Sequence, residues 1–513
     1  MLPQTGCHPQ PATAEIAALA KSRNLHSSSK SSATVRSLPR TFAIPLEDLA
    51  CAALFALFAM QGSIPGIAPP QALEVTASVP GSLTTWGGIL SQALANALIA
   101  VLLLRSPRLL LRGIASVPWL ALLAALAIAS TAWSLDPALT LRRSVPFALA
   151  GLFGLWFAAR FSQPRQLAIL RLALVALALA TIAMVVFAPS IALDHSSGHA
   201  ADWQGVFTQK NSCGRIMVLA IAVLLFGERL TRAPGRSSCR GGFTRAPGRS
   251  SCRGGLTAAR SLSLVICVFV LVMSGSRSAW LIAIALVLLR LALELAHRAG
   301  PRARNALVVA APLLILACAC SAVLLFPWIA LRLGRDPTLS GRTAVWSQVL
   351  HAIANRPLLG YGYDAFWRGM TGPSLQIDAA LHFVVEHAHN GFLEILLELG
   401  AAGLALFVLS LLRAARRLGP LLLRGDLRRI AFPLAVLVLI LLCNLDENTL
   451  LLFNGIFWPL CVAALAQIEQ LAQPGPAPQT RDRRHVAAPP PHDNLNSRRA
   501  LAPHRGAALR SSS

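Results

Sequence analysis

The stretch LAILRLALVALALATIAMVVFA, residues 167–188, decides the fold class of this chain. Arg171 is its only charged residue, and almost all the others are Leu, Ala, Val, Ile or Met. A helix needs about 20 consecutive apolar residues to cross the hydrocarbon core of a bilayer. The apolar residues also lack the period-of-two alternation that is typical of a membrane β-barrel strand. The stretch therefore predicts a transmembrane helix.

Similar apolar stretches recur along the chain. Of its 513 residues 55% are hydrophobic and only 13% are charged, whereas an ordinary soluble domain has about 25% charged residues. This composition excludes a soluble multidomain enzyme. We expect an all-α integral membrane protein with about twelve transmembrane helices. The predicted spans are 43–60, 83–104, 114–133, 144–160, 167–188, 211–228, 258–274, 279–295, 306–326, 391–411, 429–445 and 449–468.

The basic residues are distributed unevenly between the two sides of these spans. The net charge is +25, from 46 Lys and Arg against 21 Asp and Glu. Most of the basic residues fall in the two tails and in alternate loops, whereas the loop 62–82 has none. An excess of Lys and Arg marks the cytoplasmic side of a membrane protein. We therefore expect a multi-pass protein with both termini in the cytoplasm, in contact with the lipid bilayer and with no nucleic-acid partner.

This sidedness divides the chain into five parts. Residues 1–42 and 469–513 are expected to be basic, disordered cytoplasmic tails. Residues 43–326 contain the first nine predicted spans, and residues 391–468 contain the last three. The large outer loop 327–390 lies between them. Loops longer than about 12–15 residues are usually functional, so we expect the functional site at this loop.

The outer loop carries several candidate functional groups. Apolar side chains within residues 342–355 have helical spacing, which predicts that part of the loop is an amphipathic helix at the membrane surface, and Arg342 stands in the same segment. His389 and Asn390 stand where the loop enters the next span. A histidine at this level either acts as a base or is an ordinary interfacial residue. His387 is a nearby competitor for the role of base.

Four further charged residues lie inside predicted spans or in a short outer turn. Glu394 and Glu398 share one face of a predicted helix. Carboxylates within a span either face a polar cavity or pair with basic residues of neighbouring helices. Arg215 lies about one turn inside an apolar run, and Arg277 is the only charge of a tight outer turn. Because the positive-inside bias disfavours arginine here, these two either hold an anion such as phosphate or cap a helix.

Four motifs occur in order along the chain. They are GVFTQKN (205–211), SGSRSAW (274–280), RPLLGYGYDAFW (356–367), and a His-Asn pair followed after nine residues by Gly-x-x-Gly. The last motif consists of His389, Asn390, Gly400 and Gly403. With the predicted topology, these motifs resemble the O-antigen ligase/polymerase family of bacterial envelope glycosyltransferases. The form of the third motif is closest to members that polymerise exopolysaccharide.

The resemblance implies a GT-C-like glycosyltransferase at the outer face of the bacterial inner (cytoplasmic) membrane. The implied donor is a glycan linked to undecaprenyl diphosphate, and the implied acceptor is lipid A–core or another glycan. The resemblance assigns His389 as the general base, and Arg215 and Arg277 as ligands of the diphosphate. The other residues expected to contact substrate are Arg342, Lys210, Asn211 and Asn390.

The sequence leaves several alternatives open. No cofactor and no metal is expected, because the ten cysteines show no zinc-ligand spacing and the resemblance implies neither. Lys210 and Asn211 either contact substrate or shape the entry to a span. Acceptor identity is not written in the motifs, so ligase, polymerase and protein O-glycosyltransferase are all possible. A transporter of lipid-linked oligosaccharide that performs no glycosyl transfer, and a non-catalytic scaffold, are the alternatives from other classes.

Overall fold

The computed structural model describes residues 45–62, 83–195, 201–227, 250–332, 341–368, 371–423 and 427–473. Within these ranges the regular elements are helices, and the only β-type pairing is an isolated bridge between Leu193 and Trp203. The prediction of an all-α chain is confirmed. The predicted tails lie outside the described residues, except that the last helix continues to Ala472.

A helix overlaps each predicted span. The helices are α1 (Leu46–Ala59), α2 (Leu83–Leu104), α3 (Pro107–Ser116), α4 (Pro118–Ala129), the 3₁₀ helix η2 (Ser130–Ala132), α5 (Pro137–Arg160), α6 (Gln163–Phe187), α7 (Pro189–Ala192), α8 (Lys210–Gly227), α9 (Ser250–Met273), α10 (Arg277–Arg298), α11 (Pro301–Arg332), α12 (Arg342–Asn355), α13 (Ser374–Leu381), α14 (Gly391–Leu423), α15 (Leu427–Asp446) and α16 (Phe457–Ala472).

Several of these helices are long and apolar enough to cross a membrane. In the described part of the chain there are six, within α6, α8, α10, α11, α14 and α15, and the bent pair α2–α3 can form a seventh span. This set is typical of a multi-pass membrane protein. The count of about twelve spans and the GT-C-like arrangement stay predictions.

The chain divides into a short unit, residues 1–50, and a large unit, residues 51–513. The described part of the short unit is the first turn of α1, where the Pro45 carbonyl accepts hydrogen bonds from the amides of Asp48 and Leu49 at 2.9 and 3.1 Å. The large unit contains all the other helices, and both sites described below lie in it.

Helices α8 and α15 form the centre of the large unit. In their most apolar windows 83% and 78% of residues are buried, against 33% in α10 and 11% in α11. Helices α10 and α11 therefore expose leucines such as Leu288 and Leu314, as expected for helices that face lipid. Helices α5 and α16 pack closely at Gly154, because this residue has no side chain. A Cβ atom there would lie 2.1 Å from the Pro459 carbonyl oxygen. Small residues allow such close helix packing in membranes.

Helix α3 differs from the prediction, which treated residues 105–113 as a loop. Pro107 and Pro118 each stand at the first position of a helix, where the missing amide hydrogen costs nothing. Each proline therefore starts a new helix, and α3 bends away from α2 by 96°. The span predicted at 114–133 begins at Pro118 for the same reason.

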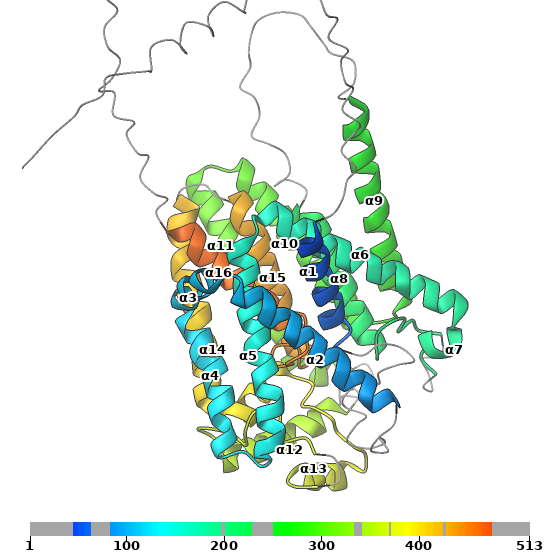
Figure 1. Cartoon of the computed structure of the whole chain (residues 1–513), viewed down its shortest axis with the longest axis vertical. Coiled ribbons are helices and arrows are strands. Elements are labelled where there is room, and N and C mark those ends of the chain that lie inside the picture. The colour runs from blue at the N-terminus through cyan, green and yellow to red at the C-terminus, as the bar shows by residue number, and fades with distance from the viewer. Residues whose placement is uncertain are drawn as a thin grey trace, which may run out of the picture. The chain divides into compact units, whose positions relative to one another are not determined.

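The predicted outer loop contains two helices, α12 and α13, which lie at the lower end of the helices in Figure 1. Helix α12 has the range 342–355 predicted for the amphipathic helix, and it buries Val345 and Val349. Helix α11 continues to Arg332, so the loop begins later in the chain than the predicted residue 327.

Helix α16 also begins later than predicted, at Phe457 and not at 449. The side chain of Asn444 turns the chain directly after α15, because its Oδ1 accepts hydrogen bonds from the amides of Thr449 and Leu450, both at 3.2 Å. Residues 447–456 therefore form a loop. This loop begins with Glu447, which becomes central to the site.

Helix α14 is interrupted at Gly400, the glycine of the His-Asn motif. Its φ of 64° and ψ of −165° lie in a region that only glycine adopts readily. The break frees backbone groups that the loop 357–362 then satisfies. The amides of Ala401 and Ala402 donate to the carbonyls of Pro357 and Leu358 at 2.8 and 3.1 Å. The loop of the third motif is thus bonded to α14 at the two residues that directly follow Gly400.

We expect Gly400→Ala to destabilise the protein by about 1–3 kcal/mol from backbone strain alone. The added Cβ would also lie 2.3 Å from the backbone of Leu358, so the loop would have to move. Thermal unfolding in detergent measures the loss. Gly419→Ala is the matched control in the same helix, because a Cβ there meets nothing within 4 Å. Equal melting temperatures for both variants would contradict the packing described here.

Candidate functional site

The site is built around the carboxylate of Glu447, which directly follows α15. This residue is 3% exposed. Its Oε1 lies 2.6 Å from Nδ1 of His389, and its Oε2 lies 3.4 Å from Nε2 of His387. The centroids of the two imidazole rings are 4.1 Å apart. One buried carboxylate therefore contacts both histidines of the loop that precedes α14.

Arg342 closes the cluster from the first residue of α12. Its Nη2 lies 3.3 Å from Oε1 of Glu447, and its Nη1 forms an ion pair with Asp446. The guanidinium thus links two adjacent carboxylates at the end of α15. We had expected Arg342 to contact substrate. Its engagement with these acidic residues favours the role of holding Glu447 in place.

The charges around Glu447 determine its protonation. Burial raises the pKa of this carboxyl, but the nearby imidazole of His387, the hydrogen bond from His389 and the positive charge of Arg215 together hold it below its ordinary range. Glu447 is therefore ionised at neutral pH. Burial lowers the pKa of His387 to about 4, despite the attraction of the Glu447 charge. His387 is therefore neutral at the same pH.

The hydrogen bonds distinguish the two histidines as candidate bases. Nδ1 of His387 accepts from the His389 amide at 3.2 Å, and its Nε2 faces Glu447, so both ring nitrogens are engaged. His389 faces the ionised Glu447 through Nδ1, which must then carry the proton. Within the described residues its Nε2 has no partner, and the side chain is 33% exposed. His389 is thus the histidine with a free lone pair.

Arg215 is the second cation beside the cluster. It lies on α8, is 5% exposed, and donates from Nη2 to Oγ of Ser212 at 3.1 Å. Its Nη1 is buried without a hydrogen-bond partner among the described residues. The side chain lines a small cavity together with Gln61 and Thr449. A buried guanidinium with an unused donor is suited to bind an anion.

Arg277 is placed differently. It begins α10, its side chain is exposed, and in the described part of the chain it forms no ion pair with the Glu447 cluster. The turn before it packs on α8, since a Cβ atom at Gly214 would lie 2.8 Å from the Cβ atoms of Ser276 and Ala279. The structure thus brings Arg277 to the helix that carries Arg215, but not into the cluster.

Two other predicted substrate ligands already have protein partners. Nζ of Lys210 lies 2.8 Å from Asp202 and 3.8 Å from Asp194, so its charge is balanced locally. Oδ1 of Asn211 accepts from Oγ of Ser276 at 3.0 Å and ties α8 to the turn before α10. Both contacts favour the alternative that these residues shape the entry to α8.

Asn390 caps α14. Its Oδ1 accepts hydrogen bonds from the amides of Phe392 and Leu393 at 3.0 and 3.1 Å. The first amides of a helix otherwise lack partners. The preceding His389 adopts a left-handed φ of 49°. The cap therefore fixes the backbone on which the His389 imidazole is presented, and it favours a positioning role for Asn390 over substrate contact.

Glu394 supports the same loop from inside α14. Its Oε1 accepts from Nε1 of Trp367 at 2.6 Å, and its Oε2 accepts from the amide of Ala388 at 2.8 Å. Ala388 lies between the two histidines of the cluster. Within the described residues neither Glu394 nor Glu398 forms an ion pair with an arginine or lysine. The described part of the structure therefore does not support the alternative that these carboxylates pair with basic residues of neighbouring helices.

Sequence reasoning missed Glu447 and Asp446. The signal was present, because two adjacent acidic residues interrupt the apolar sequence between 427 and 472. They were overlooked because they fell in the short turn expected between two spans. Only the fold shows that this turn meets the loop that carries His389, although 58 residues separate the two along the chain.

His387, His389 and Glu447 could also serve as metal ligands, since their donor atoms lie within 4.8 Å of one another. The charges around them oppose a cation. Arg342 occupies the same carboxylate oxygen as His389, and Arg215 adds a second positive charge nearby. A bound divalent cation would face both guanidinium groups. The arrangement is better suited to moving a proton beside an anion.

We expect the stability of the folded chain to depend on pH through His387. Its pKa falls from 6.5 to about 4 on folding. Between pH 6.5 and about 4 the His387 imidazole binds a proton in the unfolded state but stays neutral in the folded state. The free energy of unfolding therefore decreases as pH falls through this range. Unfolding in detergent at several pH values measures this slope. His387→Gln should flatten it, and an unchanged slope would show that His387 is not the titrating group.

Fold and site together define a multi-pass helical membrane protein in which two histidines contact a buried glutamate near a buried arginine. Comparison with known proteins indicates the family that the chain resembles. Residues 262–408 match the family described as O-antigen ligase. The resemblance to the O-antigen ligase/polymerase family is thereby confirmed.

Individual relatives agree with the family match. The chain is 39% identical over 98 residues to a protein named as a polysaccharide ligase in Rickettsia prowazekii, which covers 17% of this chain and 24% of that protein. It is 37% identical over 87 residues to the exopolysaccharide production protein ExoQ of Rhizobium meliloti, covering 16% of this chain and 19% of ExoQ. The chain thus spans about a quarter or less of the length of these relatives.

Proposed function

We propose that this protein transfers a glycan from undecaprenyl diphosphate to a hydroxyl acceptor at the outer face of the bacterial inner membrane. The observation that carries the proposal is the pair formed by Glu447 and His389, in which Nε2 of His389 has no partner among the described residues, while the charge of the buried Arg215 acts on the same Glu447. The family match and the names of the relatives support a glycan as the substrate.

In the proposed reaction Nε2 of His389 takes the proton of the acceptor hydroxyl as its oxygen attacks the anomeric carbon. The bond between that carbon and the diphosphate oxygen breaks, and the diphosphate leaves as an anion. The ionised Glu447 holds the Nδ1 proton of His389 and stabilises the imidazolium that forms. General base catalysis of this kind contributes about 10²–10⁴-fold.

Arginines complete the proposed site. Arg215 has an unused buried donor that can bind a diphosphate oxygen and stabilise its developing charge. Arg277 is proposed as an outer contact to the same diphosphate, because it begins the helix that packs on α8. Arg342 is proposed to hold Glu447 and Asp446, so that it acts through them and not on substrate directly.

We expect Arg215→Ala to lose transfer activity by about 10²-fold or more, as removal of a single oxyanion donor does. Arg215→Lys keeps the charge but loses the forked geometry of the guanidinium, and we expect it to retain more activity than the alanine variant. Transfer to acceptor in isolated membranes measures both. Equal losses would argue against a bidentate contact with the diphosphate.

Deletion of the gene followed by analysis of surface glycans tests the proposed function. Loss of all glycan from lipid A would identify a ligase, retention of single repeat units would identify a polymerase, and loss from surface protein would identify a protein O-glycosyltransferase. Unchanged linkage, with lipid-linked glycan trapped on the inner face, would support the transporter alternative and contradict the proposal. Complementation with the wild-type gene is the control, and restoration of the original surface glycan would assign the effect to this protein.

A further inference from the structure

A second charged site lies toward the other end of α14, within a recess between α4 and α14. Arg413, Arg416 and Arg417 are spaced so that they share one face of the helix. They line an open cavity of about 400 Å³ together with Trp119, Leu409, Leu412 and Pro420. Neither the family match nor the proposed mechanism gives these residues a task.

The charges in this recess are not balanced. Glu469 of α16 is 4% exposed and accepts from Nε of Arg413 at 2.7 Å and from Nε of Arg417 at 3.1 Å. Arg416 is exposed and has no acidic partner in the described part of the chain. Glu469 thus pairs with two of the three guanidinium groups and Arg416 keeps an unbalanced charge, and this surplus of positive charge predicts an anionic ligand.

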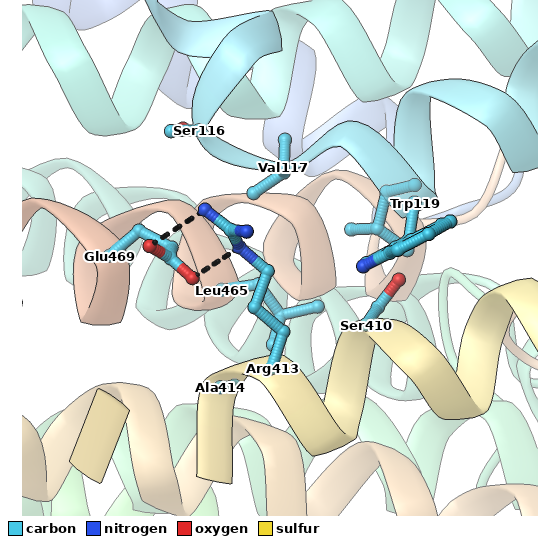
Figure 2. Close-up of a pocket in the computed structure, with 9 residues that line it drawn as sticks. Ser116, Val117, Trp119, Ser410, Arg413, Ala414, Leu465 and Glu469 are labelled. Atoms are coloured by element: carbon cyan, nitrogen blue, oxygen red, sulfur yellow. Dashed lines mark hydrogen bonds and ion pairs between the residues drawn. The ribbon is translucent and has the colours of Figure 1, made fainter. Parts of the chain in front are cut away.

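The ion pair with Glu469 fixes the geometry of the recess. Figure 2 shows the Arg413 side chain between Glu469 and Trp119, with its guanidinium directed toward the carboxylate. Figure 2 draws a small pocket next to the recess, and Trp119 and Arg413 line both of them. The aromatic ring and the anchored guanidinium thus both border the recess, while the exposed Arg416 is available to contact a ligand.

The position along α14 places the recess near a bilayer surface. Arg413 lies up to roughly 33 Å along α14 from its first residue, counting the segments on both sides of the break at Gly400, and this path is close to the roughly 30 Å of a hydrocarbon core. The His389 cluster lies at the start of α14, so the recess lies toward the opposite end of that helix. The side predicted to be cytoplasmic carries the basic residues, and tryptophan is enriched at such interfaces.

The apolar residues of the recess indicate what kind of anion binds there. Leu409 and Leu412 are 37% and 49% exposed and lie directly beside the arginines. A free phosphate ion would use the guanidinium groups but not these leucines, whereas a phospholipid would use both. Basic pockets between transmembrane helices on the cytoplasmic side commonly bind lipid headgroups.

We propose that this recess binds the phosphodiester headgroup of an anionic phospholipid of the inner leaflet. Arg416 is the main contact, and the Arg413 and Arg417 guanidinium groups contribute while Glu469 holds them in place. The acyl chains lie along Leu409 and Leu412, and the Trp119 ring borders the headgroup. This lipid is distinct from the glycan carrier, whose diphosphate belongs to the Arg215 end of the helices.

Native mass spectrometry of the full-length protein tests the proposal with phosphatidylglycerol and phosphatidylcholine as probes. We expect wild type to retain phosphatidylglycerol in preference to phosphatidylcholine. Arg416→Gln should weaken phosphatidylglycerol binding about fivefold, which is the effect of one arginine near an anionic surface. Arg298→Gln is the matched control, because Arg298 is an exposed arginine at the end of α10 outside the recess; it should leave binding unchanged.

Three results would overturn the proposal. The first is equal retention of both lipids by wild type, and the second is an equal loss of phosphatidylglycerol from Arg416→Gln and Arg298→Gln, which would indicate general surface charge. Displacement of phosphatidylglycerol by an equal concentration of inorganic phosphate would show a free-phosphate site instead. Arg416 is exposed, so its variant should fold, and an unchanged melting temperature confirms this. The outcome does not depend on glycan transfer.

Discussion

His389→Ala is expected to lower glycan transfer by about 10²–10⁴-fold while the protein still inserts into the membrane. The variant removes the imidazole whose Nδ1 is held by Glu447 at 2.6 Å and whose Nε2 is free to accept a proton. Without it, water or a distant group must take the proton of the acceptor. Surface glycan in cells that carry only the variant gene measures the effect.

His351→Ala is the matched control for this prediction. His351 lies on α12, is exposed, and among the described residues its ring is hydrogen-bonded only to the carbonyl of Ser347 in the same helix. The control should produce normal surface glycan at the same level of protein in the membrane. Normal glycan in the His389→Ala cells would remove this histidine from the mechanism and would return His387 as the candidate base.

Glu447→Gln is expected to lower transfer on the order of 10²-fold or more, even though the side chain keeps its size. A carboxylate requires that the proton sits on Nδ1 of His389, whereas an amide can donate to that nitrogen and stabilise the wrong tautomer. The variant also leaves Arg342 with one carboxylate, that of Asp446. Isolated membranes with labelled donor measure the rate.

Glu386→Gln provides the comparison in the same loop, because Glu386 is exposed and outside the ion-pair cluster described here. It should leave the rate within a small factor of wild type. The melting temperature of Glu447→Gln separates loss of chemistry from loss of folding. A rate equal to that of Glu386→Gln in a folded protein would rule out control of His389 by this carboxylate.

The fold was readable from the sequence where apolar composition alone determines it. The ranges 83–104 and 167–188 correspond to α2 and α6 within a few residues. The helix at 342–355 was also predicted, because the helical spacing of its apolar residues is a local property of the sequence. Helix α3 was not predicted, because its start depends on Pro107 and on the bend after α2. The onset of α16 depends on hydrogen bonds of Asn444 that no local pattern reveals.

Only part of the candidate functional site could be predicted from the sequence. His389 was predicted as the base from its motif, and the fold adds Glu447 as the partner that gives it a defined tautomer. Glu447 was not identified, because its role depends on contact between two loops distant in sequence. The buried position of Arg215 agrees with the cost expected of a charge in a span. For Lys210 and Asn211 substrate contact stays a prediction, since their contacts in the structure are with Asp202 and Ser276.

The most direct measurement of the central claim uses the purified protein in lipid nanodiscs. Undecaprenyl-diphosphate-linked glycan and a hydroxyl acceptor are added, and mass spectrometry follows the glycosylated acceptor and the released undecaprenyl diphosphate. The account predicts that both products form together in equal amounts with wild type, and that Ala in place of His389 suppresses both. Equal product formation by the variant would contradict it. So would the absence of product from folded wild-type protein that is supplied with the donor and acceptor identified in the deletion strain.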